Sequence, residues 1–307
     1  MTEEEVPGVL TAPPPADLVV ILVAIAAVST SAPLIVATAA PTLAIAFWRN
    51  AMASGVLVPW ALARHRGELV GLTARERRLA VVAGVLLAAH FATWVPSLAY
   101  TSVSSATALV ATQPIWAALL ARRAGHVIPR RAWVGIVTAV VGAALVTGVD
   151  VTLSTRALAG DVLAVVGGFF AAAYVVAGGE VRRSVSTTTY TTVCYLTTSV
   201  VLLLVCAVGR QQLTGYSADG WIKLVALTVG AQFLGHSLFN RALRTTSPTV
   251  VSMSILFEVP GASLIAALWL HQHPHVAAAP GLLLILAGVG TVIASRDRAI
   301  APAVPAE

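Results

Sequence analysis

Apolar runs recur along the whole chain, and each is close to the ~20 residues that a helix needs to cross the hydrocarbon core of a bilayer. Charged residues make up only 10% of the sequence, whereas a soluble globular domain carries about 25%. A water-soluble fold of 307 residues could not cover its surface with so few charges. The sequence therefore predicts an all-α integral membrane protein, because a helix satisfies its own backbone polar groups without water.

The hydropathy pattern predicts ten transmembrane helices. Glycines at 167 and 168 are expected to interrupt the sixth helix, and Glu258 and Pro260 the ninth. The predicted spans are residues 18–38, 41–63, 79–100, 104–120, 132–149, 161–177, 190–208, 221–240, 249–270 and 276–295.

The distribution of Lys and Arg agrees with this map if the N-terminus is cytoplasmic. Fifteen of the 19 basic residues then fall in cytoplasmic segments, against three outside, which are Arg156, Arg210 and Lys223. Arg49 alone falls inside a span. This bias is the one that the positive-inside rule demands. We therefore expect a multi-pass protein of the cell (inner) membrane with both termini in the cytoplasm. The net charge of +6 then reflects topology, so no nucleic-acid partner is expected.

The two halves of the sequence match one another when they are shifted by 146 residues. The matched pairs are Gly84 with Gly230, His90 with His236, Pro114 with Pro260, Gly135 with Gly281 and Gly142 with Gly288. The basic loops of one half correspond to loops nearly free of Arg and Lys in the other, so the second half should insert upside down. The predicted organisation is a disordered cytoplasmic segment 1–17, inverted five-helix repeats at 18–149 and 161–295, and a cytoplasmic tail 296–307. Such inverted repeats give transporters two alternative states around a midplane site.

Several short motifs resemble those of EamA-type transporters of the drug/metabolite transporter superfamily. The first half has an apolar run that ends in Arg49 and later the pair Gln113-Pro114, and the second half has Leu256-Phe-Glu258-Val-Pro260 before a Gly-rich last helix. The resemblance covers roughly residues 18–295. It implies a ten-helix exporter or permease of amino acids, nucleosides or similar metabolites.

Two charged residues inside predicted spans are the main site candidates. Glu258 lies between apolar residues and just before Pro260. A carboxylate at this depth costs at least ~2.5 kcal/mol, so it should face a cavity, find a partner or be protonated. Its alternative role is a structural hydrogen bond between helices. Arg49 could bind a substrate carboxylate or pair with Glu258, or it could extend towards the membrane surface.

Other candidates are polar or aromatic residues in the predicted spans. His90 and His236 occupy equivalent places in the halves and, with Glu258, are candidates for proton coupling, although either could be an ordinary core histidine. Trp94, Tyr174 and Asn240 are candidate substrate contacts, as are Gln113 and Gln232. The alternative for the aromatic residues is packing or the interfacial belt.

Three classes of function remain open on the sequence alone. The first is a secondary transporter of small metabolites, with proton coupling as an option. An intramembrane enzyme would need a motif such as G-x-S-x-G or H-E-x-x-H, and neither is present, so no enzyme activity is expected. The third class is a non-transporting membrane assembly subunit. No cofactor or metal is predicted, because the histidines at 271–275 lack companion ligands. A homodimer is compatible with the sequence.

Overall fold

The computed structural model describes residues 15–123, 128–182, 184–235, 238 and 254–300, and every element within them is helical. The first half comprises α1 (Pro15–Ser29), α2 (Ser31–Ala37), α3 (Thr42–Arg64), α4 (Arg66–Gly71), α5 (Ala74–Ser97), α6 (Val103–Val110), α7 (Gln113–Arg123) and α8 (Arg130–Leu153). The second half comprises α9 (Thr155–Val181), α10 (Thr187–Val208), α11 (Ala218–Leu227), the π-helix η1 (Thr228–Gly235), α14 (Glu258–Trp269), the 3₁₀-helix η2 (Val276–Ala278) and α15 (Ala279–Ile300).

Seven of these helical segments are long and apolar enough to cross a membrane, and Glu258–Trp269 is a shorter apolar helix. Exposed Val and Leu side chains cover much of the outer surface, which suits contact with lipid. The chain is therefore a multi-pass membrane protein, and the count of ten spans stays a prediction. Several predicted ends need correction: α1 begins at Pro15 rather than at residue 18, α5 begins at Ala74 rather than at residue 79, α9 spans Thr155–Val181 rather than 161–177, and α15 continues to Ile300. Residues 1–14 and 301–307 lie outside the described part of the chain.

Two predicted spans are broken at equivalent places. The fourth span divides into α6 and α7, with Ala111 and Thr112 between them and Pro114 in the first turn of α7. In the ninth span, Leu256 and Phe257 form a turn before α14, which has Pro260 in its first turn. The 146-residue shift relates the two breaks. Proline is tolerated in a first helical turn because its missing N–H has no intrahelical partner there.

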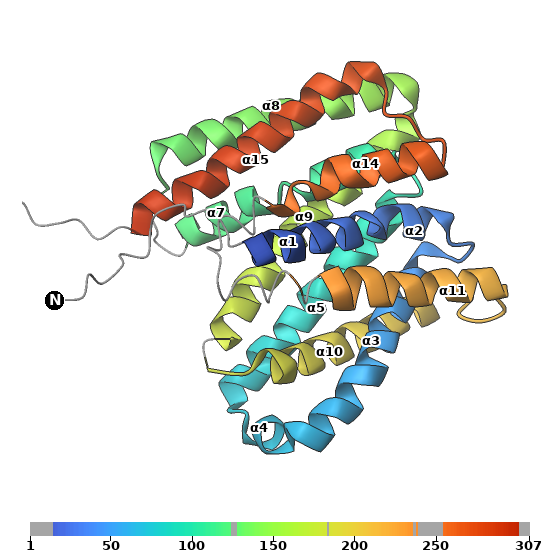
Figure 1. Ribbon diagram of the computed structural model, residues 1–307, viewed down its shortest axis with the longest axis vertical. Helices are drawn as coiled ribbons and strands as arrows, with labels where there is room; N and C mark the ends of the chain where they lie inside the picture. Colours follow the sequence, from blue (N-terminus) through green and yellow to red (C-terminus); the bar gives the residue numbers. More distant parts are fainter. Residues whose placement is uncertain (1–14, 124–127, 183, 236–237, 239–253, 301–307) are drawn as a thin grey trace, which may run out of the picture.

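The last helices of the two halves, α8 and α15, pack against each other in antiparallel directions (Figure 1). Gly135 meets the backbone of Gly288, and Gly142 meets the backbone of Gly281, which is the crossed pairing that a two-fold axis would produce. Near the same axis, the Oγ atoms of Ser54 on α3 and Ser199 on α10 form a hydrogen bond of 3.2 Å. These contacts show that the equivalent helices run in opposite directions.

The sixth predicted span is one continuous helix, α9, so the expected interruption at Gly167 and Gly168 is wrong. The two glycines instead allow close packing. A Cβ atom at Gly167 would lie 3.0 Å from Cβ of Trp94, and one at Gly168 would lie 3.1 Å from the carbonyl oxygen of Val110. Small residues at helix interfaces let backbones approach in this way. Glycine thus marks an interface here rather than a break.

The short helix α4 joins the two halves at one end of the bundle. Its Glu68 carboxylate accepts hydrogen bonds from Ser186 N at 2.6 Å, Ser186 Oγ at 2.5 Å and Thr189 Oγ1 at 2.5 Å, at the start of α10. Glu76 on α5 accepts a further bond from Ser184 Oγ. Carboxylates are favoured at helix N-termini by the exposed N–H groups and the helix dipole. The connection between the halves is therefore fixed by anion–helix contacts.

These contacts predict a pH-dependent stability. Burial alone would raise the pKa of Glu68, but the hydrogen bonds from Ser186 and Thr189 outweigh it and lower the pKa below 4.5. A lowered carboxyl pKa stabilises the folded protein above the unfolded pKa, and this contribution is lost as the pH falls through the folded pKa. We expect Glu68→Gln to lower the thermal midpoint at pH 7 by roughly 2–4 °C and to have little effect in acid below the folded pKa.

Thermal unfolding of the detergent-purified variants across this pH range measures the effect. Ser186→Ala is the matched partner variant, because the two changes should not add if they break the same contact. An equal loss for Glu68→Gln at every pH would contradict the assignment.

Candidate functional site

Arg49 is the centre of a buried polar cluster, the Arg49 cluster, formed with Asn50 and Gln232. The side chain of Arg49 is only 2% exposed, although it lies in the middle of α3. Its Nε donates to Gln232 Oε1 at 3.0 Å, and Gln232 Nε2 donates to Asn50 Oδ1 at 3.4 Å. Nη1 of Arg49 is buried without a hydrogen-bond partner. A guanidinium held in this way, with free donors, is equipped to bind an anionic group.

The π-helix η1 places Gln232 opposite Arg49. In a π-helix each backbone hydrogen bond spans five residues, one more than in an α-helix, and such segments occur often at functional sites. Gln232 is 4% exposed, and Asn50 is fully buried and also anchored through Nδ2 to the Ala46 carbonyl oxygen. Both amides are therefore fixed by their own contacts. The cluster is closed to solvent in this structure.

A row of rings connects Arg49 to two of the predicted residues. Its guanidinium carbon lies 4.6 Å from the centroid of the Phe91 ring, in a cation–π contact. The Phe91 and His90 rings are 4.9 Å apart, and His90 stacks on Trp94 at 5.7 Å with an 8° angle between the planes. His90 Nδ1 also makes a 3.0 Å hydrogen bond with the carbonyl oxygen of Gly167. The structure thus brings Arg49, His90 and Trp94 to one side of α5.

Tyr195 on α10 forms another side of the cluster and interacts electrostatically with Arg49. The predicted residue Tyr174 on α9 interacts in turn with Tyr195 and Tyr190. Both phenols lie among partly buried apolar residues that pack against the core. Tyr174 therefore reaches the Arg49 cluster through Tyr195 rather than directly.

Glu258, at the start of α14, interacts electrostatically with Arg49. It is the first residue of that helix and not the mid-helix residue that the sequence suggested, because the chain turns at Leu256 and Phe257. Its carboxyl group and the Arg49 guanidinium each affect the other electrostatically, but they form no direct ion pair in the described residues. Glu258 is half-buried. The two opposite charges thus interact without direct contact.

The remaining predicted residues are less closely connected with Arg49. Gln113 is half-buried at the start of α7, directly after the break in the fourth span. Asn240 and His236 lie outside the described residues. In the part of the chain that the structure describes, no three His, Cys, Asp or Glu side chains come together as metal ligands.

Three members of the site were missed by sequence reasoning, namely Asn50, Phe91 and Tyr195. Phe91 follows His90 directly in the sequence. Tyr195 is the residue of the second half that corresponds to Asn50 when the halves are aligned by the 145-residue shift that relates the bonded serines Ser54 and Ser199. The register of the repeat could therefore have pointed to Tyr195. No pattern in the sequence distinguished Phe91 from other apolar residues of its helix.

An apolar cavity of about 460 Å³ lies on another face of the break before α14. It is lined by Leu256, Phe257 and Pro260 and by residues of α15. Neither Arg49 nor Glu258 lines it. The cavity therefore belongs to the apolar surface beside the break, and not to the Arg49 cluster.

Comparison with known proteins identifies a family that matches both halves of the chain. The model of the EamA-like transporter family matches residues 15–148 and again residues 158–294. A solved structure, described only as the crystal structure of a protein, is 18% identical and aligns with a TM-score of 0.61 over 90% of this chain and 96% of that one. At this identity the likeness concerns the fold alone. No curated protein matches the sequence significantly. Two family matches that together span nearly all of the helical chain establish the assignment: this chain belongs to the EamA-like transporter family, whose two-repeat architecture it has.

Proposed function

We propose that the chain is a secondary transporter that moves small zwitterionic metabolites, with amino acids as the first candidates, by alternating access between its two halves. The observation that carries the proposal is the buried Arg49, whose Nη1 has no partner and whose guanidinium interacts electrostatically with Glu258 at a helix break. Buried charges are expensive, so a free guanidinium donor at this depth favours binding to an anionic ligand.

The two charges suit the two ends of an amino acid. Its carboxylate would bind Nη1 of Arg49, and its ammonium group would bind the carboxylate of Glu258. Phe91 and Tyr195 would contact its apolar side chain. Nucleosides lack the opposite charges that this arrangement matches, so they are the second candidate class.

Alternating access is supported by the antiparallel repeats and by the equivalent helix breaks at Pro114 and Pro260. The basic loops favour an inner-membrane location with cytoplasmic termini. The family resemblance favours export of the metabolite from the cytoplasm.

The test uses purified protein reconstituted in liposomes. Uptake of labelled amino acids and nucleosides is measured with and without an imposed pH gradient. Saturable uptake of a zwitterion, with weaker or no uptake of nucleosides, is the expected result. Transport of nucleosides alone would overturn the proposed substrate class, and the absence of protein-dependent flux for either class would overturn the transport function.

Glu258 carries a separate prediction on coupling. If Glu258 takes up a proton during the cycle, Glu258→Gln should abolish the stimulation by a pH gradient, because glutamine cannot exchange a proton. Exchange of labelled for unlabelled substrate should persist at roughly one tenth of the wild-type rate. The reason is that the charged hydrogen bond to the ammonium group of the substrate is replaced by a neutral one. Gradient-driven accumulation is the measurement. A variant that still accumulates substrate fully under the gradient would exclude the proton role of Glu258.

A further inference from the structure

A second buried carboxyl group lies in the first turns of α9, away from the Arg49 cluster. Asp161 is 1% exposed, and both of its carboxyl oxygens are buried without a hydrogen-bond partner. A carboxylate in such a place costs several kcal/mol, because it has lost its water and Thr101 and Thr147 replace only part of that hydration. Its surroundings must therefore supply a positive charge or a proton.

The groups around Asp161 include a second acid. Asp150 on α8, which is 7% exposed, interacts with Asp161, and Thr101 and Thr147 face the same carboxyl group. Thr101 Oγ1 donates to Asp150 Oδ2 at 3.2 Å. Gly160 lies so close to Thr101 that a Cβ atom there would be 2.8 Å from the Thr101 backbone nitrogen. This tight contact fixes α9 against the turn that carries Thr101, and it holds the two acids in place.

The nearest arginine on the same helix is directed elsewhere. The guanidinium group of Arg156 lies 4.8 Å from the centroid of the Tyr100 ring, and its Nη2 donates to the Ala99 carbonyl oxygen at 3.3 Å. The other titratable groups beside the pair are His273 and His275, which precede α15 and line the same pocket as Asp150. No arginine or lysine is among the groups that affect Asp161. The acid pair is thus without a fixed counter-charge in the described residues.

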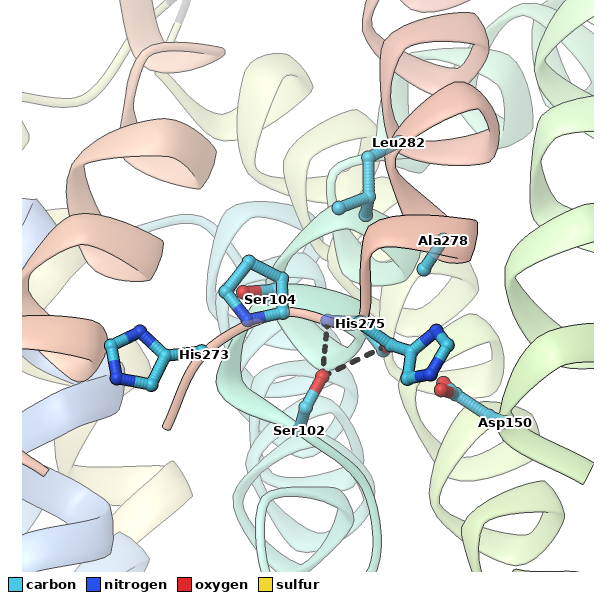
Figure 2. Close-up of a pocket in the computed structure, with 9 residues that line it drawn as sticks. Ser102, Ser104, Asp150, His273, His275, Ala278 and Leu282 are labelled. Carbon is cyan, nitrogen blue, oxygen red and sulfur yellow. Dashed lines mark hydrogen bonds between the residues drawn. The ribbon is translucent and has the colours of Figure 1, made fainter. Parts of the chain in front are cut away.

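A pocket of about 170 Å³ is lined by Asp150, the first member of this pair (Figure 2). Asp150 and His275 lie at one end of the pocket, His273 lies at the other, and Ser102 and Ser104 lie between them. The pocket is at the end of the bundle where α14 leads into α15, opposite the end of α7 with its two arginines (Figure 1). Water in the pocket can therefore reach Asp150, which interacts with the buried Asp161.

We propose that Asp150 and Asp161 form a proton-binding site that holds one shared proton and is filled through this pocket. Two adjacent carboxylates in a dry environment cannot both be ionised, and one proton between them leaves a single negative charge. Thr101 then donates to the oxygen of Asp150 that does not share the proton. A proton enters from water in the pocket to Asp150 and is shared with Asp161. The site is separate from Glu258 and does not depend on the proposed substrate.

The test is infrared spectroscopy of the purified, full-length protein at pH 5. The carboxylic-acid C=O stretch reports a protonated side chain, and we expect Asp161→Asn to remove the band of one carboxylic acid per chain. Asp219→Asn is the matched control, because Asp219 is exposed and paired with Lys223 Nζ at 2.5 Å. It should leave that band unchanged. An acid band that persists unchanged in Asp161→Asn would overturn the proposal.

Wild-type protein alone provides a second measurement if the variant fails to fold. Raising the pH should remove the same acid band and lower the thermal midpoint, because the second carboxylate then becomes charged beside the first. Replacing sodium with a large organic cation should change neither the band nor the thermal midpoint. Stabilisation that requires sodium and has no acid band would show that the pair binds a metal cation, and it would overturn the proton assignment. Neither measurement uses transport, so a failure of the proton-site proposal is distinguishable from a failure of the proposed transport function.

Discussion

Replacing Arg49 with alanine is expected to lower transport efficiency by about 10- to 100-fold, because a hydrogen bond to a charged group contributes about 1.5–3 kcal/mol. The loss should appear mainly as a higher KM, since the anionic end of the substrate loses its fixed donor. The change also leaves the Oε1 atom of Gln232 without its 3.0 Å partner. Initial rates of uptake in liposomes at several substrate concentrations measure the effect.

Two further arginine variants make this result specific. Arg49→Lys keeps the positive charge but replaces a planar group by a point charge, so it cannot donate to Gln232 and to a substrate with the same geometry. We expect it to recover only part of the loss. Arg64→Ala is the control, because Arg64 is an exposed residue at the end of the same helix and lies over the Trp60 ring. It should transport normally. A correctly folded Arg49→Ala protein with unchanged KM and rate would exclude Arg49 from the substrate site.

Adding one methyl group at Gly142 is expected to lower the stability of the folded protein by about 1–3 kcal/mol. A Cβ atom there would lie 2.7 Å from the Gly281 carbonyl oxygen and 2.7 Å from the Ile285 backbone nitrogen. Both are backbone atoms of α15, so no side-chain rotation relieves the clash. The thermal midpoint of Gly142→Ala in detergent should fall by roughly 3–10 °C.

Gly148 provides the matched control in the same helix, α8. A Cβ atom at Gly148 would meet no atom within 4 Å, and alanine is the better helix former. Gly148→Ala should therefore leave the thermal midpoint unchanged or raise it slightly. Equal midpoints for the two variants would contradict the close contact between α8 and α15.

The repeat and the helix positions could be predicted because they depend on patterns within the chain. The apolar runs marked the helices, and the glycines at 135, 142, 281 and 288, matched by the 146-residue shift, lie in the antiparallel contact between α8 and α15. Pro260 correctly indicated a broken helix. Pro114, which matches Pro260, likewise indicated the break between α6 and α7.

The partners inside the site could not be predicted in the same way. Gln232 reaches Arg49 from η1, which is a π-helix. The hydropathy of a π-helical segment does not differ from that of an α-helix, so the sequence pattern could not indicate this geometry. Phe91 became part of the site only through the packing of α5 beside α3. Gly167 led to the wrong prediction of a helix break, because glycine occurs both where helices break and where two helices pack closely. Each of these outcomes depends on which helix lies opposite, and hydropathy does not record that.

The two halves share the broken fourth helix of each repeat but differ in their chemistry. The residue equivalent to Glu258 in the first half is Thr112, which is buried and donates to the carbonyl oxygen of Leu109 at 2.6 Å. Arg49 has no basic equivalent in the second half. The 145-residue shift that relates Ser54 to Ser199 aligns Arg49 with Cys194. Each half thus contributes one charge to the proposed site. The cation comes from the first half and the carboxylate from the second.

Counterflow is the measurement that tests the proposed carrier most directly. Liposomes containing the protein are loaded with an unlabelled zwitterionic substrate, and the uptake of the same labelled compound is followed without any ion gradient. Alternating access around one site predicts that internal substrate accelerates labelled uptake several-fold and that Arg49→Ala abolishes the acceleration. Uptake that is insensitive to internal substrate, as in a channel, or no protein-dependent uptake of any compound tested, would contradict the proposed function.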